Sequence, residues 1–274
     1  MSHLRVCWVV GAPVEHSLSP VIHNAAFAAL DLDWSYFAVS VPPGQAGRAV
    51  AAMRSLRLGG VSVTMPHKQD AAAAVDVLTP AAERLGAVNC LAWRGTRIEG
   101  DSTDGAGFLD SLRVDHAWDP EGTRAVVVGA GGAARAVVAA LADAGAREVA
   151  VVNRSADRAR AAAALAGDRG RVVGTEAVDD ADLVVNATPV GMGGDGALPL
   201  DADRLGAGQV VADLVYEPLE TPLLVAARAR GAVPVTGIGM LVHQAAHAFR
   251  AWTGEDPPVE VMSAAVVAAL STHG

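Results

Sequence analysis

Aromatic side chains, cysteine and lysine are scarce in this chain of 274 residues. Phe, Trp and Tyr together make up 4% of the sequence, whereas 51% of it is hydrophobic and Ala, Val and Gly predominate. So many small side chains favour closely packed helices and strands over a bulky aromatic core. The length is sufficient for one large domain or two modest ones.

The sequence also lacks basic tracts and long apolar runs. Its formal net charge of −9 argues against nucleic acid or an anionic membrane as a partner. No run of about 18 apolar residues is free of charges or turn signals, and the start has no signal-peptide pattern, so we expect a cytoplasmic protein without a membrane partner. Cys7 and Cys90 lie in apolar runs and are expected to be buried free thiols rather than a disulfide.

The basic residues single out Lys68. Of the 21 basic residues, 20 are arginines and this one is a lysine. An arginine stays protonated at neutral pH, whereas a lysine amine can exchange a proton once its pKa is lowered. Lys68 is therefore a candidate for proton transfer, and the alternative is a surface lysine retained by chance.

Alternating apolar segments and turn signals predict an α/β protein. Strands are expected at residues 4–10, 34–41, 61–65, 88–93 and 97–99, with helices at 19–30, 44–57, across 67–85 and at 105–112. After a turn at 115–122, strands are expected at 125–128, 148–152, 171–173, 182–187, 209–214 and 232–235, with helices at 133–144, 155–166, 241–252 and 259–270. The regular alternation after residue 125 implies parallel strands with covering helices.

The strand at 125–128 runs directly into a glycine-rich turn and a helix. Gly129, Gly131 and Ala134 fit the pattern G-x-G-x-x-G/A, with Gly132 and Ala133 between them. The first glycine permits the tight turn, the second lets the backbone approach a pyrophosphate, and the small third residue lets the helix pack on the strand. The helix N-terminus offers N–H groups to the phosphates, so dinucleotide binding is favoured over a plain structural turn.

The end of the next strand bears on the choice of cofactor. NAD-selective sites usually have Asp or Glu here to bond the ribose 2′-hydroxyl, whereas this chain has Asn153 and Arg154, with Arg158 one helical turn further. Cations near a helix N-terminus oppose its dipole, which makes a 2′-phosphate an attractive partner. NADP is therefore favoured over NAD, and the alternative is that both arginines are simply solvated.

Residues 11–24, GAPVEHSLSPVIHN, form an unusual loop that leads into a helix. Ser17 and Ser19 could both direct hydroxyls at a carboxylate near the start of that helix. From spacing alone, a plain N-cap followed by Pro20 is the favoured interpretation of Ser19. His16 and His23 have no metal-type partners at a recognisable spacing and are interpreted as structural, so no metal is expected.

Several motifs, taken in order, resemble the shikimate dehydrogenase family. Residues 11–24 match its G-x-P-x-x-H-S-x-S-P-x-x-H-N segment, and residues 63–68 match its V-T-x-P-x-K segment. Further matches are AVN at 87–89, TDGAG at 103–107, NAT at 186–188, GM at 191–192, DLVYEP at 213–218, TPL at 221–223 and GIGMLVHQA at 237–245. The resemblance covers residues 8–250 and includes the nucleotide turn.

The resemblance implies a ligand for each candidate residue. Ser17 and Ser19 would bind the substrate carboxylate. The residues around the ring hydroxyls and the reacting carbon would be Thr64, Lys68, Asn89, Asp104, Tyr216 and Gln244. Beside Gly129 and Arg158 from the nucleotide pattern, those that hold NADP would be Gly131, Gly132, Ala133, Asn153, Arg154, Thr188, Gly237 and Met240.

The resemblance also implies a reaction, the interconversion of shikimate and 3-dehydroshikimate with NADP. The lone Lys68 falls on the family's catalytic lysine, and it would exchange a proton with the reacting oxygen. Asp104 would orient the lysine amine; from its place before a glycine alone, it could equally be a turn or cap residue. An adjacent carboxylate raises a lysine pKa and burial lowers it, so the sequence leaves the net shift open.

Four positions depart from the family's usual residues. The chain has Ser62 and Ser102 where Asn is frequent, Cys90 where Thr is frequent, and Pro189 where Ser is common. None is in the catalytic pair, but all bear on how the substrate is positioned. A quinate or quinate/shikimate dehydrogenase, even one that uses NAD, therefore stays an alternative. A more distant alternative is a non-catalytic ligand-sensing module, whose signature would be the loss of Lys68 or Asp104.

Two α/β domains follow from this organisation. A substrate-binding catalytic domain is expected at 1–110 and 240–274, so that the C-terminal helices return to it, and a Rossmann-type NADP domain is expected at 111–239. Because the chain crosses twice, the domains could close as the cofactor binds. The expected partner is the small-molecule substrate, and the expected state is a monomer or a homodimer.

Overall fold

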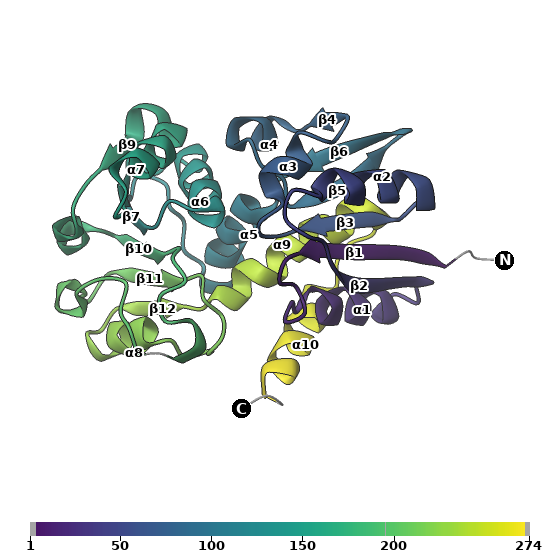
Figure 1. The fold of residues 1–274 in the computed structure, drawn as a ribbon. Helices are drawn as coiled ribbons and strands as arrows, with labels where there is room; N and C mark the ends of the chain where they lie inside the picture. Colours follow the sequence, from purple (N-terminus) through teal and green to yellow (C-terminus); the bar gives the residue numbers. More distant parts are fainter. Residues whose placement is uncertain (1–3, 195, 272–274) are drawn as a thin grey trace. The chain divides into compact units, whose positions relative to one another are not determined.

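The computed structural model describes residues 4–194 and 196–271. The chain divides into two compact units, one of Met1–Thr103 with Val242–Gly274 and one of Asp104–Leu241 (Figure 1). The domain boundaries expected from the sequence lie near residues 110 and 239, and the helix that follows Thr103 falls in the second unit.

A six-stranded mixed sheet forms the centre of the first unit. Its strands are β1 (Arg5–Gly11), β2 (Trp34–Ser40), β3 (Gly60–Val63), β4 (Val77–Leu78), β5 (Cys90–Arg94) and β6 (Arg97–Asp101). Their order is β2-β1-β3-β5-β6-β4; β2, β1 and β3 are parallel, and β5 is antiparallel to β3 and β6. β5 and β6, which were both expected as strands, form an antiparallel hairpin, whereas β4 interrupts the stretch 67–85 that was expected to be helical.

Helices cover both faces of this sheet (Figure 1). They are α1 (Ser19–Ala29), α2 (Ala46–Leu56), α3 (Lys68–Ala72), α4 (Pro80–Leu85), α9 (Gly237–Thr253) from Val242 onwards, and α10 (Val259–Ser271). The buried positions of α2 are Ala46, Ala49, Val50 and Met53. That spacing gives the helix one apolar stripe, which packs against the valines of β1 and β3. α1 and α10 lie on the opposite face.

Aromatic rings gather between α1, α9 and the sheet. His23 of α1 stacks on Tyr36 of β2 with ring centroids 4.5 Å apart, and the ring of Trp252 on α9 lies 4.9 Å from that of His23. A Cβ at Gly60 would overlap the Trp252 ring, so glycine at this position lets α9 approach the sheet. Several of the scarce aromatic residues of this unit thus form a local cluster, although small side chains predominate in the chain.

Acid is expected to weaken the folded state through His23. Burial lowers the pKa of His23 to about 3, whereas a histidine in an unfolded chain has a pKa of about 6.5. Between those values the unfolded chain binds a proton that the folded chain does not, so the free energy of unfolding falls by up to about 1.4 kcal/mol per pH unit as pH drops. Urea unfolding between about pH 5 and 7.5 measures this slope. His23→Leu should flatten it, and equal slopes in parent and variant would contradict the assignment.

The second unit is built on a six-stranded parallel sheet. Its strands are β7 (Arg124–Val128), β8 (Glu148–Val152), β9 (Gly170–Val172), β10 (Leu183–Asn186), β11 (Val210–Asp213) and β12 (Val233–Val235). Their order is β12-β11-β10-β7-β8-β9, and every neighbouring pair is parallel. Two half-sheets therefore meet between β7 and β10, which is the strand order of a Rossmann fold and the place where such sheets bind ligands.

The helices of the second unit cover both faces of its sheet. They are α5 (Asp104–Asp110), which continues as a π-helical turn (Ser111–Asp115), α6 (Gly132–Asp143), α7 (Ala156–Ala163), α8 (Pro222–Ala229) and the start of α9. Side chains of α5, α6 and α7 share one core with alternate residues of β7 and β8. Those of α8 and of the loop around Leu200 form the core on the other face. α8 was not expected from the sequence, although Thr221 caps it and Pro222 is its first residue.

The cysteines and the helix lengths can be compared with the expectations from the sequence. Cys7 and Cys90 are free and buried, as expected, and burial raises the pKa of both thiols. Among the described residues, no helix combines the length and the apolar character needed to cross a membrane.

Candidate functional site

The loop after β1 places the two candidate carboxylate-binding serines at the start of α1. The N-cap of α1 is Leu18, and no side chain caps the helix. Ser19 is the first helical residue and is 8% exposed, so its interpretation as an N-cap was wrong. Ser17 Oγ accepts a hydrogen bond from the Ser19 N–H at 3.3 Å. A hydroxyl that accepts in this way can still donate its own proton, as a carboxylate ligand requires.

Thr64 and Lys68 lie on the loop that follows β3. The Thr64 N–H donates to the carbonyl of Val10 at 2.9 Å, which ties this loop to the end of β1. A Cβ at Gly11 would lie 2.5 Å from the Thr64 methyl group, so only glycine allows the two loops to approach this closely. Lys68 is the first residue of α3, and its carbonyl accepts a hydrogen bond from the Val88 N–H at 3.0 Å. The backbone that carries the lysine is thus held on two sides.

Asn89 and Gln244 are brought together in the first unit. The Asn89 Nδ2 donates to Gln244 Oε1 at 3.3 Å, although the two residues are 155 positions apart. Thr103 joins them: its N–H donates to Asn89 Oδ1 at 2.8 Å, and its hydroxyl donates to the Gln244 carbonyl at 3.0 Å. Asn89 is buried, and these contacts fix the orientation of its amide.

Asp104 is the first residue of α5 in the second unit and is 7% exposed. A carboxylate in the first turn of a helix is stabilised by the helix dipole. The next residue, Gly105, faces α6: a Cβ on it would lie 2.9 Å from the Ala136 carbonyl oxygen and from Ala140 Cβ. Close packing of α5 on α6 therefore requires the glycine of the TDG motif.

The glycine-rich turn has the geometry that a pyrophosphate site needs. Gly129 follows β7 with φ of +119°, and a Cβ there would lie 2.8 Å from the Ala187 carbonyl, so the position accepts only glycine. Gly131 is the N-cap of α6, and nothing among the described residues lies within 4 Å of a Cβ built on it. Contacts within the protein therefore do not explain Gly131, whereas the approach of a ligand would. Gly132 and Ala133 begin α6.

Two arginines stand exposed beside the start of α7. The helix is capped by Ser155, whose Oγ accepts from the Arg158 N–H, and Asn153 Nδ2 donates to the Ser155 carbonyl at 3.0 Å. Arg154 precedes the cap and Arg158 lies in the first turn. Within the described part of the chain, neither guanidinium has an acidic partner, whereas Arg160 on the same helix pairs with Asp157. Two unpaired cations at a helix N-terminus form a favourable place for a phosphate.

A buried network holds the loops after β10 and β11. Asn186 donates to Asp213 Oδ1 at 2.8 Å, and the Thr221 hydroxyl donates to Asp213 Oδ2 at 2.7 Å. Burial raises the pKa of Asp213. Asn186 Oδ1 also accepts from both the N–H and the hydroxyl of Thr188, at 3.0 and 2.7 Å. The network thereby fixes Thr188 at the carboxyl end of β10, beside the first glycine of the turn.

The remaining candidates lie after β11 and β12. Tyr216 is partly buried, and burial together with Glu217 raises the pKa of its hydroxyl. Gly237 starts α9, where a Cβ would lie 2.6 Å from the Leu214 carbonyl, and Met240 is buried one turn further. These residues follow neighbouring parallel strands, so they share one edge of the sheet with the glycine-rich turn.

Three residues outside the predicted set hold the candidates in place. They are Thr103, Asn186 and Asp213, which are buried and bond directly to candidate residues or their loops. Each is the first residue of a motif that resembles the family, TDGAG, NAT or DLVYEP. The motifs were therefore a usable signal, but a supporting role leaves no chemical pattern in the sequence by which to separate it from a binding role.

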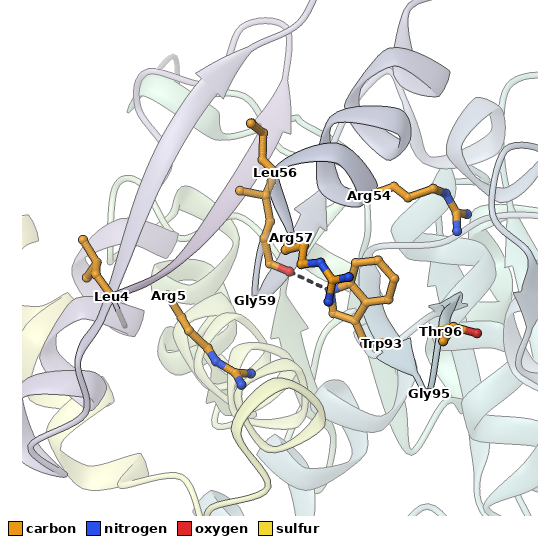
Figure 2. A pocket seen from close by; sticks show the side chains of 10 residues that line it. Leu4, Arg5, Arg54, Leu56, Arg57, Gly59, Trp93, Gly95 and Thr96 are labelled. Atoms are coloured by element: carbon orange, nitrogen blue, oxygen red, sulfur yellow. Dashed lines mark hydrogen bonds between the residues drawn. The ribbon is translucent and has the colours of Figure 1, made fainter. Parts of the chain in front are cut away.

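A cavity of about 600 Å³ lies elsewhere in the first unit and contains none of the candidate residues (Figure 2). Arg5, Arg54 and Arg57 line it, together with the Trp93 ring, whose Nε1 donates to the Leu58 carbonyl at 2.7 Å. Arg54 is already paired with Asp76 at 2.7 Å. No group of three or more metal-ligating side chains occurs among the described residues.

The strand order of the second unit, with a glycine-rich turn at its switch point, defines a Rossmann-type dinucleotide-binding domain. Joined to a separate α/β unit that carries a lone lysine, it places the chain in the class of two-domain nicotinamide-dependent dehydrogenases. Residues 9–91 match the shikimate dehydrogenase substrate binding domain, 114–190 the shikimate / quinate 5-dehydrogenase family, and 237–267 the shikimate 5′-dehydrogenase C-terminal domain. The chain belongs to the shikimate dehydrogenase family.

Relatives and solved structures agree with this assignment. A shikimate dehydrogenase (NADP(+)) of Methanopyrus kandleri is 47% identical over 275 residues, which cover 96% of this chain and 95% of the relative. The structure of shikimate 5-dehydrogenase from Thermus thermophilus in complex with NADP(H) and shikimate has a TM-score of 0.91 at 41% identity, covering 97% of this chain and 100% of that one. A quinate dehydrogenase from Corynebacterium glutamicum in complex with NAD has a TM-score of 0.89 at 30% identity, covering 96% and 99%.

Proposed function

We propose that this protein is an NADP-dependent shikimate dehydrogenase, which reversibly reduces 3-dehydroshikimate to shikimate in aromatic amino acid biosynthesis. The observation that carries the proposal is the place of the only lysine. Lys68 follows a parallel strand and stands where the family resemblance implies the catalytic lysine, in a chain that matches an NADP(H) and shikimate complex over 97% of its length.

Lys68 and Asp104 form the proposed catalytic pair. Oxidation of the secondary alcohol breaks its O–H and C–H bonds, and Lys68 takes the hydroxyl proton while the carbonyl forms. In reduction, the same amine returns the proton to the substrate oxygen. By the family resemblance, Asp104 would orient the lysine amine and accept a hydrogen bond from a neighbouring hydroxyl. When bound, NADP accepts the hydride, and NADPH supplies it in the reverse direction.

The other polar candidates hold the substrate. Ser17 and Ser19 donate hydrogen bonds to its carboxylate, since both hydroxyls lie at the start of α1. Thr64, Asn89, Tyr216 and Gln244 bond the ring hydroxyls. The contacts that already fix Asn89 and Gln244 support this role, because an oriented amide loses little freedom when it binds.

NADP fits the residues of the second unit. The open space around Gly131 admits a pyrophosphate at the N-terminus of α6, with Gly129, Gly132 and Ala133 around it. Arg154 and Arg158 would bind the 2′-phosphate, and Asn153 would bond the ribose. Thr188, Gly237 and Met240, at the same sheet edge, would hold the rest of the cofactor.

The experiment that tests the function is initial-rate NADPH formation by the purified full chain, followed by nicotinamide absorbance. Shikimate and quinate are each assayed with NADP and with NAD. We expect turnover to be fastest with shikimate and NADP. Turnover mainly with quinate or NAD would keep the chemistry and move the specificity to that of a quinate dehydrogenase. A folded protein with no turnover in any combination would contradict the proposal and favour a ligand-sensing role.

We also propose a cytoplasmic location and a monomeric or homodimeric state. The two buried free thiols are compatible with a reducing compartment. Light scattering coupled to size-exclusion chromatography distinguishes the two states, and a larger mass would contradict both.

A further inference from the structure

The hydroxyl of Tyr36 is buried without a hydrogen-bond partner. The side chain is 1% exposed, and no donor or acceptor among the described residues meets the distance and angle of a hydrogen bond to its oxygen. A loosely placed side chain does not explain the missing partner, because contacts of the backbone and of the ring hold Tyr36 in place. Its N–H donates to Asn24 Oδ1 at 2.8 Å, its carbonyl accepts from Asn24 Nδ2 at 3.0 Å, and its ring stacks on His23.

The elements around this ring direct it toward the start of α1. Ser19 lies four residues before His23, so both occupy the same face of the helix, one turn apart. Across the sheet, Tyr36 is in register with Cys7 and Cys7 with Gly60, so Ser62, two residues further along β3, shares that face. Ser19 and Ser62 thus flank the tyrosine from the helix and from the sheet.

The chemistry of the hydroxyl follows from this environment. Burial raises the pKa of Tyr36 well above its ordinary value, and the hydroxyls of Ser62 and Ser19 offset part of that effect. Tyr36 therefore keeps its proton and can act as a hydrogen-bond donor. The two serines are close enough to influence it, yet neither meets the geometry of a hydrogen bond with it.

An unpaired buried hydroxyl destabilises a fold, and replacement by a phenyl ring of the same shape would remove that penalty. A residue kept for packing alone has no need of the hydroxyl. Ser19, in contrast, has a need for a donor: to give its own proton to a carboxylate, it gains from accepting a second hydrogen bond, which polarises its O–H.

We propose that Tyr36 is a positioning residue for the carboxylate-binding serines, donating to Ser19 Oγ when a cyclic monocarboxylic acid binds so that Ser19 donates to the substrate carboxylate. This inference rests on the proposed function, because it assumes that Ser19 receives the carboxylate. The preference for an acid over its neutral derivatives would then depend on the Tyr36 hydroxyl, which contacts Ser19 and not the substrate.

The test is Tyr36→Phe, assayed with shikimate and with its methyl ester. We expect KM for shikimate to rise about 5–10-fold, which is the loss of one hydrogen bond. The rise for the ester should be smaller, since the ester carries no charge, and kcat and KM for NADP should stay within about twofold. The melting temperature should stay equal to that of the parent or increase, because an unpaired buried hydroxyl has been removed.

The matched control is Phe27→Leu, since the Phe27 ring lies 6.2 Å from that of His23 in the same cluster but carries no hydroxyl. This variant should melt at a lower temperature and keep the parent KM for both substrates. A Tyr36→Phe variant with unchanged KM, or with equal rises for acid and ester, would overturn the inference while leaving the function intact. A parent chain that turns over neither substrate would overturn the function, and this inference with it.

Discussion

Replacing Lys68 with alanine is expected to lower kcat for shikimate oxidation by about 10²–10⁴-fold, the range that one positioned acid–base group contributes. The chain has no other lysine to take over the proton transfer. NADP affinity should be unchanged, because all the proposed cofactor residues lie in Asp104–Leu241 and Lys68 does not. Initial rates with saturating NADP measure the loss, and fluorescence titration with NADPH measures the binding.

Two further substitutions separate proton transfer from charge and from folding. Lys68→Arg keeps the positive charge but cannot release a proton at neutral pH, so it should be nearly as inactive as the alanine variant. Gln69→Ala changes the exposed neighbour in the same short helix and should keep the parent rate. An arginine variant with near-parent turnover would show that charge alone is needed, and an active alanine variant would remove Lys68 from the mechanism.

Replacing Arg154 with alanine is expected to weaken NADP binding by about 10–100-fold, which corresponds to one charge-assisted hydrogen bond. NAD lacks the 2′-phosphate, so its affinity should change by less than about twofold. The side chain is exposed and has no acidic partner among the described residues, so the loss reports on the ligand rather than on the fold. Isothermal titration with each cofactor gives the two dissociation constants.

Arg160→Ala is the matched control for this measurement. Arg160 belongs to the same helix, but its guanidinium is already paired with Asp157. Its removal should leave both affinities as they are. Equal losses of NADP and NAD on replacing Arg154 would mean that this residue does not discriminate the phosphate, and Arg158 would then become the leading candidate.

The sequence predicted most of the second unit because its signals are local. Strands of four or five apolar residues alternate with helices, and Gly129 marks the turn that only a positive φ allows. The two elements that were not predicted, β4 of the first unit and α8 of the second, were missed for local reasons as well. β4 has two residues, too few for a period, and the start of α8 carried its signal in Thr221 and Pro222, which were matched as a family motif without being interpreted as a cap.

For the candidate site, the sequence offers a set of residues but not their arrangement. Family motifs supplied Asn89 and Gln244, yet nothing in the periodicity indicates that two amides so far apart in sequence share a hydrogen bond. The error at Ser19 has a different cause. A serine followed by proline fits a capped helix. In the structure, however, the N-cap is Leu18, and Ser19 lies in the first turn, where its hydroxyl does not cap the backbone.

The first unit is assembled from both ends of the chain, and this has a consequence for biosynthesis. The Trp252 ring fills the space that Gly60 leaves open and donates to the Leu91 carbonyl at 3.0 Å. A ribosome releases these partners far apart in time, with the entire second unit between them. The N-terminal sheet therefore emerges with the face that α9 approaches covered only by α1, while the continuous second unit can fold as soon as it is made. The first unit can therefore be completed only after α9 and α10 have been made, and it has to close a long loop to do so.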